Sequence, residues 1–261
     1  MRITTWNINS VRLRLEQLAR VIEETRCDVI CLQEIKAQNA DFPADEIAAL
    51  GFPHQLVRGF KSYNGVAILS RTPLEEGDSQ DWCGKVDQRH VVGILPGGVE
   101  LHNFYVPAGG DIPDPVENDK FAHKLRFITE MTSWFANHKP GKQILVGDLN
   151  IAPREADVWS HKQLVKAVSH TPVEVEHLDS LMDVQDWVDA VRHFIPEPEQ
   201  LYSWWSYRNR TWPGSDRGRR LDHIWVTPAL KSALLGIELL RDARGWKQPS
   251  DHIPVTVEIA L

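Results

Sequence analysis

The sequence lacks any apolar run that approaches the length of a membrane span, and it does not open with the charged and then apolar segments of a secretory leader. Cysteine is scarce, since Cys27, Cys31 and Cys83 are an odd set without the spacing of a metal site. We therefore expect no membrane association, unpaired thiols and a cytoplasmic location, where thiols stay reduced.

Linkers rich in glycine, serine or proline, low-complexity tracts and short internal repeats are also lacking. Layered folds of roughly 200–250 residues are often one domain. We therefore predict one domain spanning residues 1–261, and we expect it to be a monomer although no sequence pattern bears on assembly.

Two signatures of common catalytic sites are missing. The chain has neither a Gly-x-Ser-x-Gly turn with a serine nucleophile nor a glycine-rich Walker loop that would hold nucleotide phosphates. The absence of a protein nucleophile favours hydrolysis by a metal-activated water.

Acidic residues outnumber basic ones, and the formal net charge is −7. This argues weakly against a protein that binds polyanions through its overall charge. The arginines are nevertheless clustered, with five between residues 208 and 220 against one acid, Asp216. Trp204, Trp205 and Trp212 accompany this segment and suit stacking on bases or sugars. They would serve equally well in a sheet core, and the arginines in a solvated loop.

Apolar runs of strand length alternate with a few segments of helical periodicity. We predict helices over residues 15–25, 45–50, 119–138, 161–168 and 180–192, and a surface loop over 111–118. We predict strands over residues 2–6, 28–32, 65–70, 91–95, 101–106, 143–146, 203–207, 221–226, 237–240 and 253–261. Strands outnumber helices without a strict βαβ repeat, which indicates an α+β fold of two packed sheets with helices outside.

Polar side chains follow several of these strands where each one ends, a place where sheet proteins often hold their chemistry. The strand-end residues are Asn7, Glu34, Asp148, Asn150, Asp251 and His252, and Tyr105 and Asp222 lie in strands. Carboxylate and amide oxygens without cysteine suit Mg²⁺ or Mn²⁺ better than zinc.

Each of these residues also has a plain structural interpretation. The run Gly147-Asp148-Leu149-Asn150 is typical of a tight turn, and Glu34 would be an ordinary exposed acid after a strand. His252 would be a capping or core histidine, and Tyr105 a core tyrosine. Neighbours on an extended strand point to opposite faces, so Asp251 and His252 need not contact each other.

Seven segments, taken in order, resemble the motifs of exonuclease III and its abasic-site endonuclease relatives, within the endonuclease/exonuclease/phosphatase superfamily. They are Thr5-Trp6-Asn7-Ile8-Asn9-Ser10-Val11-Arg12, Leu32-Gln33-Glu34, Asn103-Phe104-Tyr105-Val106-Pro107, Gly147-Asp148-Leu149-Asn150, Ser203-Trp204-Trp205-Ser206-Tyr207-Arg208, Arg220-Leu221-Asp222-His223-Ile224 and Ser250-Asp251-His252. The likeness spans essentially the whole chain. The tyrosine, Trp-Trp-x-Tyr and Arg-Leu-Asp-His motifs narrow it to the DNA-repair branch.

The resemblance implies a DNase I-like four-layer α/β/β/α sandwich of two mixed sheets, with the site at one edge of both. It also implies a Mg²⁺-dependent phosphodiesterase, Mn²⁺ being an alternative ion, that acts on double-stranded DNA. Such an enzyme cuts 5′ to abasic sites and trims 3′ ends as a 3′→5′ exonuclease and 3′-phosphatase. The alternatives are a superfamily phosphodiesterase for RNA or phosphoinositides and a non-catalytic DNA-binding relative.

The same likeness implies a role for each matching residue. Asp148 would activate or position water, and Asn150 and His252 would hold the scissile phosphate. Tyr105 would stabilise the leaving side or contact the phosphate, and Asp222 would orient His252. The implied metal set is headed by Glu34 with Asn7 close by and Asp251 assisting, and includes Asp148, Asn150 and His252. The implied DNA contacts are Tyr63, Arg89, Trp204, Arg208, Arg219 and Leu221. Among them, Trp204 and Leu221 would form a pocket for a flipped-out abasic sugar.

Three features depart from the family pattern. Ala108 stands where relatives often have Asn or Gln on a phosphate, and Arg219 where some relatives have a pocket-wall tryptophan. The following loop, residues 109–118, is acidic where a DNA clasp would favour Arg or Lys. These departures leave the balance open among abasic-site incision, 3′-phosphatase and exonuclease activity.

Overall fold

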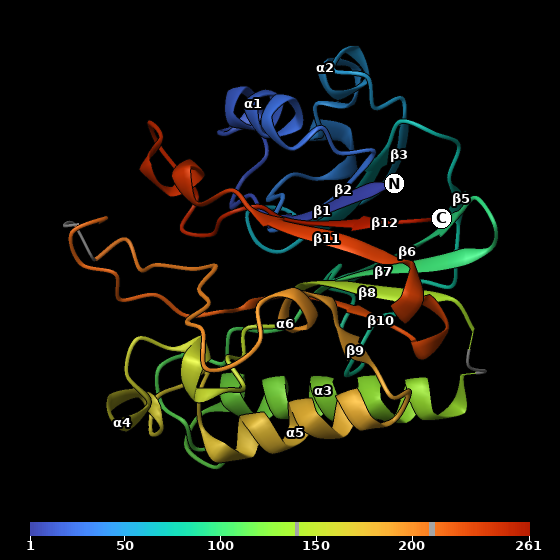
Figure 1. The fold of residues 1–261 in the computed structure, drawn as a ribbon. Coiled ribbons are helices and arrows are strands. Elements are labelled where there is room, and N and C mark those ends of the chain that lie inside the picture. Colours follow the sequence, from blue (N-terminus) through green and yellow to red (C-terminus); the bar gives the residue numbers. More distant parts are fainter. Residues whose placement is uncertain (139–140, 209–211) are drawn as a thin grey trace.

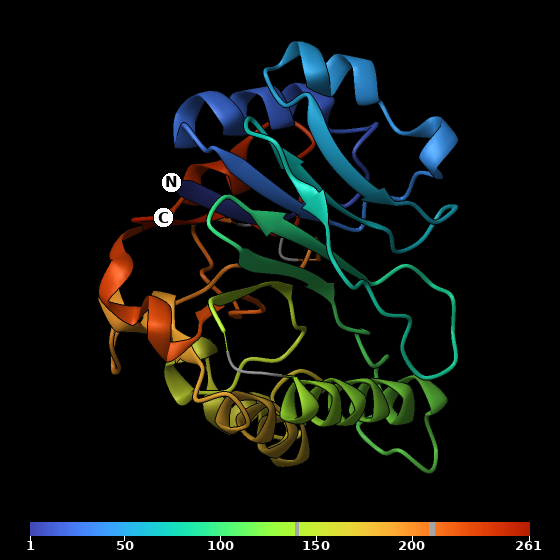
Figure 2. The same ribbon diagram turned by 90° about the vertical axis from the view of Figure 1, so that its right-hand side faces the viewer.

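The structure, a computed structural model, describes residues 1–138, 141–208 and 212–261. Two six-stranded sheets pack face to face, and helices cover both outer faces (Figures 1 and 2). Helices α1 (Leu15–Thr25) and α2 (Ala44–Ala49) lie on one side, and α3 (Asp119–Asn137) and α5 (Pro172–Asp183) on the other. The predicted four-layer α/β/β/α sandwich is confirmed.

The first sheet has the order β11-β12-β1-β2-β4-β3. Its strands are β11 (Leu234–Leu239), β12 (Val255–Ile259), β1 (Arg2–Asn7), β2 (Val29–Gln33), β4 (Val66–Ser70) and β3 (His54–Arg58). Strands β1 and β2 run parallel, whereas β12 pairs with β1 in the antiparallel sense. The strands nearest the two ends of the sequence therefore lie side by side in the centre of this sheet.

The second sheet has the order β5-β6-β7-β8-β10-β9. Its strands are β5 (Glu75–Glu76), β6 (His90–Leu95), β7 (Val99–Tyr105), β8 (Gln143–Asp148), β10 (Asp222–Val226) and β9 (Val188–Asp189). Strands β7 and β8 are parallel and pair Tyr105 with Asp148, while antiparallel β10 pairs Asp222 with the same Asp148. The register alone therefore places three predicted site residues in one row.

The shorter helices are α4 (His161–Leu164), α6 (Ala190–Phe194), and the 3-10 turns η1 (Asn39–Asp41), η2 (Glu155–Asp157), η3 (Pro228–Ala233) and η4 (Arg241–Gly245). Helix α5 begins with a capping box, in which Thr171 and Glu174 satisfy each other's backbone N–H groups and Pro172 fills the first turn. Among the described residues, no helix has both the length and the apolar character needed to cross a bilayer.

Continuous apolar runs become strands that are buried on both faces. Every residue of β2, β4, β8 and β10 is buried, because each of these strands lies between the facing sheet and a helical layer. The layer between the sheets includes Val29, Ile68, Val146 and Ile224. This packing fixes the strand ends on which the predicted site residues stand.

Two sequence predictions of local structure were wrong, and an edge strand was missed. Residues 203–207 form no strand, and Trp204 makes only isolated bridges to Arg219 and His252. The predicted helix 180–192 is the end of α5, then β9 and the start of α6, because Asp189 caps α6 through Val191 N and Arg192 N. Strand β3 was not predicted, since it is a half-buried edge strand with polar residues at both ends.

Candidate active site

The strand ends of both sheets converge on one cavity of about 960 Å³. Its lining includes Glu34, Tyr105, Asp148, Asn150 and His252. Glu34 directly follows β2, and Asn150 lies two residues beyond β8. The sequence-predicted catalytic and metal residues therefore do come together at one edge of the sandwich.

Glu34 is a largely buried carboxylate with hydrogen-bond and ion-pair partners, rather than an ordinary exposed acid. Its side chain is only 18% exposed, and its backbone has a left-handed φ of 49° that turns it out of β2. The Oε1 atom accepts hydrogen bonds from Asn7 Nδ2 at 2.9 Å and from the Tyr105 hydroxyl at 2.8 Å. Lys36 Nζ lies 2.8 Å from Oε2. Burial raises the pKa of Glu34, but the Lys36 charge and these hydrogen bonds outweigh burial and hold it below its usual value.

Asp148 lies at the centre of the site and is fully enclosed. Asn7 Nδ2 donates to its Oδ2 at 2.9 Å, and the backbone N–H of Asn150 donates to its Oδ1 at 2.9 Å. Gly147 is required before it, because a Cβ there would meet the Phe104 carbonyl oxygen at 2.0 Å. The run is thus the end of β8 followed by Leu149 and Asn150, and the chain changes direction at Asn150, which has a left-handed φ of 54°.

The side-chain amide of Asn150 faces inward. It donates to the Val106 carbonyl at 2.9 Å and to Asp148 Oδ2 at 3.2 Å. Because both N–H groups already have acceptors, a contact between this amide and a phosphate would have to replace one of them. Asn150 therefore orders the turn around Asp148 in this structure.

His252 bridges two buried carboxylates. Its Nδ1 lies 2.8 Å from Asp222 Oδ2, and its Nε2 lies 3.6 Å from Asp148 Oδ2. Burial lowers the pKa of His252, but the two carboxylates outweigh burial and raise the pKa above its usual value. Burial and the Asp222 charge raise the pKa of Asp148, although His252 opposes them. The trio can therefore hold and move a proton within the cavity.

Asp251 points away from its neighbour, as expected for adjacent residues of an extended segment. Its two oxygens accept hydrogen bonds from Asn9 Nδ2 and Trp204 Nε1, both at 3.0 Å. Asn9 in turn accepts a hydrogen bond from Lys36 Nζ at 2.6 Å. Asp251 and Glu34 are thus linked through Asn9 and Lys36.

The donor set suits a hard divalent cation. Glu34 and Asp251 offer carboxylate oxygens and Asn9 offers its Oδ1, the ligand type preferred by Mg²⁺ and Mn²⁺. Asn7 turns its Nδ2 toward Glu34 and Asp148, and its Oδ1 accepts from the backbone N–H of Asn9. The Lys36 ammonium lies between the oxygens of Glu34 and Asn9, which shows that this part of the cavity attracts positive charge. Ligand atoms of Asp148, Asp222 and His252 also lie within 4.8 Å of one another, but His252 already pairs with both acids.

The predicted DNA contacts divide into two groups. Trp204, Arg208, Arg219 and Leu221 line the cavity. The Arg89 guanidinium carbon lies 4.9 Å from the ring centroid of Tyr105, at the margin of the site. Tyr63 is 70% exposed and is not part of the cavity lining. Arg210, part of the sequence cluster, is outside the described residues.

Sequence reasoning missed Lys36, Asn9 and the aromatic contact of Arg217. The Arg217 guanidinium carbon lies 4.7 Å from the centroid of the Trp159 ring, and both residues line the cavity. Lys36 reaches Glu34 only because both residues have left-handed backbones, with φ of 51° and 49°. Residue spacing does not predict left-handed backbone conformations at non-glycine residues, because such conformations are uncommon there.

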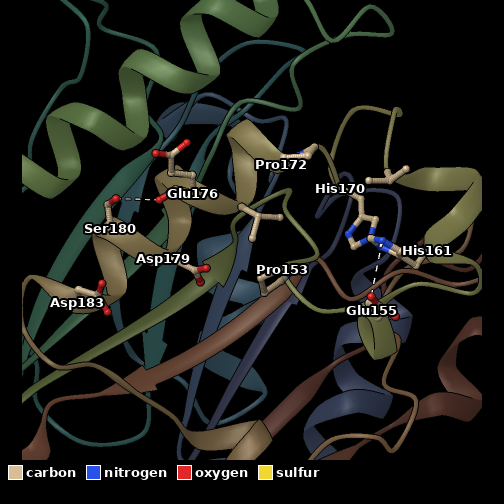
Figure 3. A pocket seen from close by; sticks show the side chains of 11 residues that line it. Pro153, Glu155, His161, His170, Pro172, Glu176, Asp179, Ser180 and Asp183 are labelled. Atoms are coloured by element: carbon tan, nitrogen blue, oxygen red, sulfur yellow. Dashed lines mark hydrogen bonds and ion pairs between the residues drawn. The ribbon is translucent and has the colours of Figure 1, made fainter.

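A second hollow of about 550 Å³ lies between α4 and α5, and Figure 3 shows its side chains. His161 Nδ1 is 2.8 Å from His170 Nε2, and His170 Nδ1 is 2.6 Å from the Ala152 carbonyl. The acids around this hollow include Glu176 and Asp179 on α5. None of the sequence-predicted site residues lines it, so the cavity at the sheet edge is the candidate active site.

Comparison with known proteins agrees with this geometry. The sequence model of the Endonuclease/Exonuclease/phosphatase family matches residues 4–252. The chain is 30% identical to Exodeoxyribonuclease III of Haemophilus influenzae, with 99% of each protein covered, and 27% identical to Exodeoxyribonuclease of Bacillus subtilis, with 100% of each covered.

Two solved structures superpose over the full length. One is the 3′ phosphatase NExo from Neisseria bound to product DNA hairpin, with a TM-score of 0.89, 32% identity and 100% of both chains covered. The other is an AP endonuclease from Archaeoglobus fulgidus, with a TM-score of 0.91, 27% identity and 100% of both chains covered.

Proposed function

Since this chain belongs to the Endonuclease/Exonuclease/phosphatase family and is a DNA-repair phosphodiesterase of the exodeoxyribonuclease III type, we propose that it acts with Mg²⁺ on duplex DNA, 5′ to abasic sites and at 3′ ends. The observation that supports this most directly is the convergence of Glu34, Asp148 and His252 in one cavity with arginines on its wall. Phosphodiester hydrolysis needs both kinds of group, because carboxylates serve the metal ion and the attacking water while cationic side chains stabilise the phosphate charge.

Glu34 is the proposed main ligand of Mg²⁺, with Mn²⁺ as an alternative ion. Asn7 and Asp251 assist, and the wider predicted set adds Asp148, Asn150 and His252. The bound ion would neutralise phosphate charge and favour attack by water. Asn7 keeps the Glu34 and Asp148 carboxylates at a fixed separation, because it donates to both.

Asp148 is the proposed acceptor of the proton from the attacking water, since burial raises its pKa and makes the carboxylate a better base. His252 would donate from Nε2 to a phosphoryl oxygen, with Asp222 holding its ring through Nδ1. Burial and the Glu34 charge keep the pKa of Tyr105 well above its usual value, so its hydroxyl stays protonated on the leaving side. The reaction forms a bond from water oxygen to phosphorus and breaks the bond from phosphorus to the 3′ oxygen, which takes up a proton.

The predicted DNA contacts complete the proposal. Trp204, Arg208, Arg219 and Leu221 would receive the damaged or terminal nucleotide, because they line the cavity. Arg89 and Tyr63 would contact the backbone outside it. We propose a cytoplasmic monomer, and the three free cysteines support a reducing compartment. Light scattering of the purified protein checks the assembly.

The experiment is incubation of a labelled duplex with one internal tetrahydrofuran residue, in Mg²⁺ and in EDTA. Tetrahydrofuran cannot undergo β-elimination, so a lyase would leave it intact. We expect a Mg²⁺-dependent cut immediately 5′ to the lesion, together with trimming of 3′ ends. Matched undamaged duplex, single-stranded RNA and a soluble phosphoinositide are the controls. Preferred turnover of RNA or phosphoinositide, or DNA binding without any turnover, would overturn the proposal.

A further inference from the structure

Arg219 stands in one row with Trp204 and His252. The backbones of Arg219 and Trp204 exchange two hydrogen bonds of 2.9 Å, and Trp204 also bridges His252 on its other side. Side chains of directly paired residues stand on the same face, with Cβ atoms about 5 Å apart. The guanidinium therefore faces the same cavity as the His252 imidazole.

The position of this guanidinium is fixed by neutral groups. Nη1 donates to the Val168 carbonyl at 2.8 Å and to Ser169 Oγ at 2.6 Å. The guanidinium carbon lies 5.4 Å from the centroid of the Trp204 ring. These contacts hold the side chain in place, and neither acceptor carries a negative charge.

Across residues 1–138, 141–208 and 212–261, no carboxylate lies within ion-pair distance of Arg219. Burial lowers the pKa of Arg219, although the more distant Glu174 charge, itself paired with Lys124, opposes burial. The next residue gives the contrast, because Arg220 points inward and pairs with Asp157 and Asp189. A partly desolvated cation without a counter-ion is costly unless an anion joins it. Arg219 therefore offers a binding position for a negatively charged ligand on the cavity wall.

The two proposed substrates differ at this wall. At an abasic site, the scissile phosphorus carries an ester oxygen that leads to a neutral sugar in the pocket. At a 3′-terminal phosphomonoester, the corresponding oxygen is unesterified, and the group carries up to one further negative charge, because its second pKa is about 6. A guanidinium recognises such oxygens through paired N–H donors, whereas a neutral deoxyribose gains nothing from the charge.

We infer that Arg219 is a specificity-determining residue that makes 3′-terminal phosphomonoesters of duplex DNA better substrates than internal abasic sites. The inference rests on the proposed function and names its preferred substrate class. In the preferred reaction, water oxygen bonds to phosphorus, the bond to the 3′ oxygen breaks, and that oxygen takes a proton. The products are inorganic phosphate and a 3′-hydroxyl end that a polymerase-class reaction can extend.

The test compares kcat/KM for a nicked duplex with a 3′-phosphate and for a duplex with internal tetrahydrofuran. The wild-type protein is expected to favour the 3′-phosphate by at least about 10-fold. Arg219→Gln is expected to lower that ratio by about 10- to 100-fold, the effect of losing one charge-assisted hydrogen bond. Arg217→Gln, on the same cavity wall, is the matched control and should preserve the ratio even if both rates fall.

Two further measurements keep the inference open to refutation. Arg219→Lys retains the positive charge but lacks the paired N–H donors of a guanidinium. Its ratio of kcat/KM for the 3′-phosphate to kcat/KM for tetrahydrofuran should therefore lie between those of wild type and Arg219→Gln. Inorganic phosphate should inhibit tetrahydrofuran incision by Arg219→Gln about 10-fold less strongly than incision by wild type. An unchanged ratio, or equal losses on both substrates, overturns the role of Arg219. Failure of wild type on both substrates would instead overturn the proposed function.

Discussion

At the scale of single residues, the site depends on a few polar groups that are buried together. Asn7 donates to Glu34 and Asp148, and His252 lies between Asp148 and Asp222. Each carboxylate is therefore held by a neighbour in the absence of substrate. Such preorganisation reduces the rearrangement needed when charge develops during hydrolysis.

Asp148→Asn should separate binding from chemistry. An amide of the same shape keeps one acceptor oxygen, for either Asn7 Nδ2 or the Asn150 backbone N–H, and it cannot take the proton from water. We expect single-turnover cleavage of the tetrahydrofuran duplex to fall by about 10²- to 10⁴-fold, the usual contribution of a general base. Fluorescence anisotropy should show DNA affinity close to wild type. A variant that retains more than a tenth of the cleavage rate would contradict the role of Asp148.

The sequence predicted the main site residues but not all of their contacts. Asp148 and Asn150 were predicted because they lie at the end of an apolar strand, His252 because it lies just before one, and all three match known motifs. Lys36 was missed because its contact with Glu34 depends on two left-handed backbones. The Arg219 guanidinium was placed in the pocket wall by resemblance, but its neutral partners come from a distant loop.

At the scale of elements, α3 and α5 hold the turn after β8 from outside. Lys124 on α3 donates to the Asn150 carbonyl at 2.7 Å and pairs with Glu174 on α5, and both charged side chains are fully buried. Glu174 also accepts from the backbone N–H groups of Ser169 and Thr171. This contact connects a helix start, a second helix and the active-site turn.

Lys124→Met should therefore lower the free energy of unfolding by about 3–5 kcal/mol, because it leaves the Glu174 charge buried without its cation. Adding Glu174→Gln should recover part of that loss, since the two changes are coupled. Urea unfolding of the single variants and of the double variant measures the coupling. If the two losses simply add, the pair does not interact as the geometry indicates.

Strands with continuous apolar runs were predictable, whereas elements shaped by their neighbours were not. Strand β8 follows from its apolar run, but β3 is half-buried and has only two apolar residues, Leu56 and Val57. Strand β9 is two residues long and exists only because β10 lies beside it. Trp204 lacks a regular strand because its partners, Arg219 and His252, belong to separate segments.

At the scale of the whole molecule, five histidines are held neutral. Burial lowers the pKa of His90, His102, His123, His170 and His223, to about 4 for His123 and His223. Around His90 and His102, the charges of Arg58 and His138 act in the same direction, while Glu100 opposes them. The unfolded chain thus binds more protons than the folded one below about pH 6.5.

The free energy of unfolding should consequently fall as the pH is lowered from about 6.5 to 4, and the carboxylates with lowered pKa values add to the loss below about pH 4.5. Asp148 and His252 act in the opposite direction because their pKa values are raised to about 7 and about 10, but they are two groups against five. Urea midpoints across this range provide the measurement.

His123→Leu is a suitable control variant, because His123 Nε2 is buried without a hydrogen-bond partner among the described residues. Its removal should reduce the slope of the unfolding free energy against pH by up to about 1.4 kcal/mol per pH unit, which corresponds to one proton fewer taken up on unfolding. A pH dependence of unchanged steepness would show that His123 does not contribute.

The pairing of β1 with β12 has a consequence for synthesis. Thr4 pairs with Thr256, and β12 lies between β11 and β1, so the first sheet cannot close while residues 255–259 are still inside the ribosome. His252 is translated only shortly before them. The nascent chain therefore acquires the last of its proposed catalytic groups and its central strand almost together, and a nuclease being made beside messenger RNA is expected to stay inactive until residue 259 has left the ribosome.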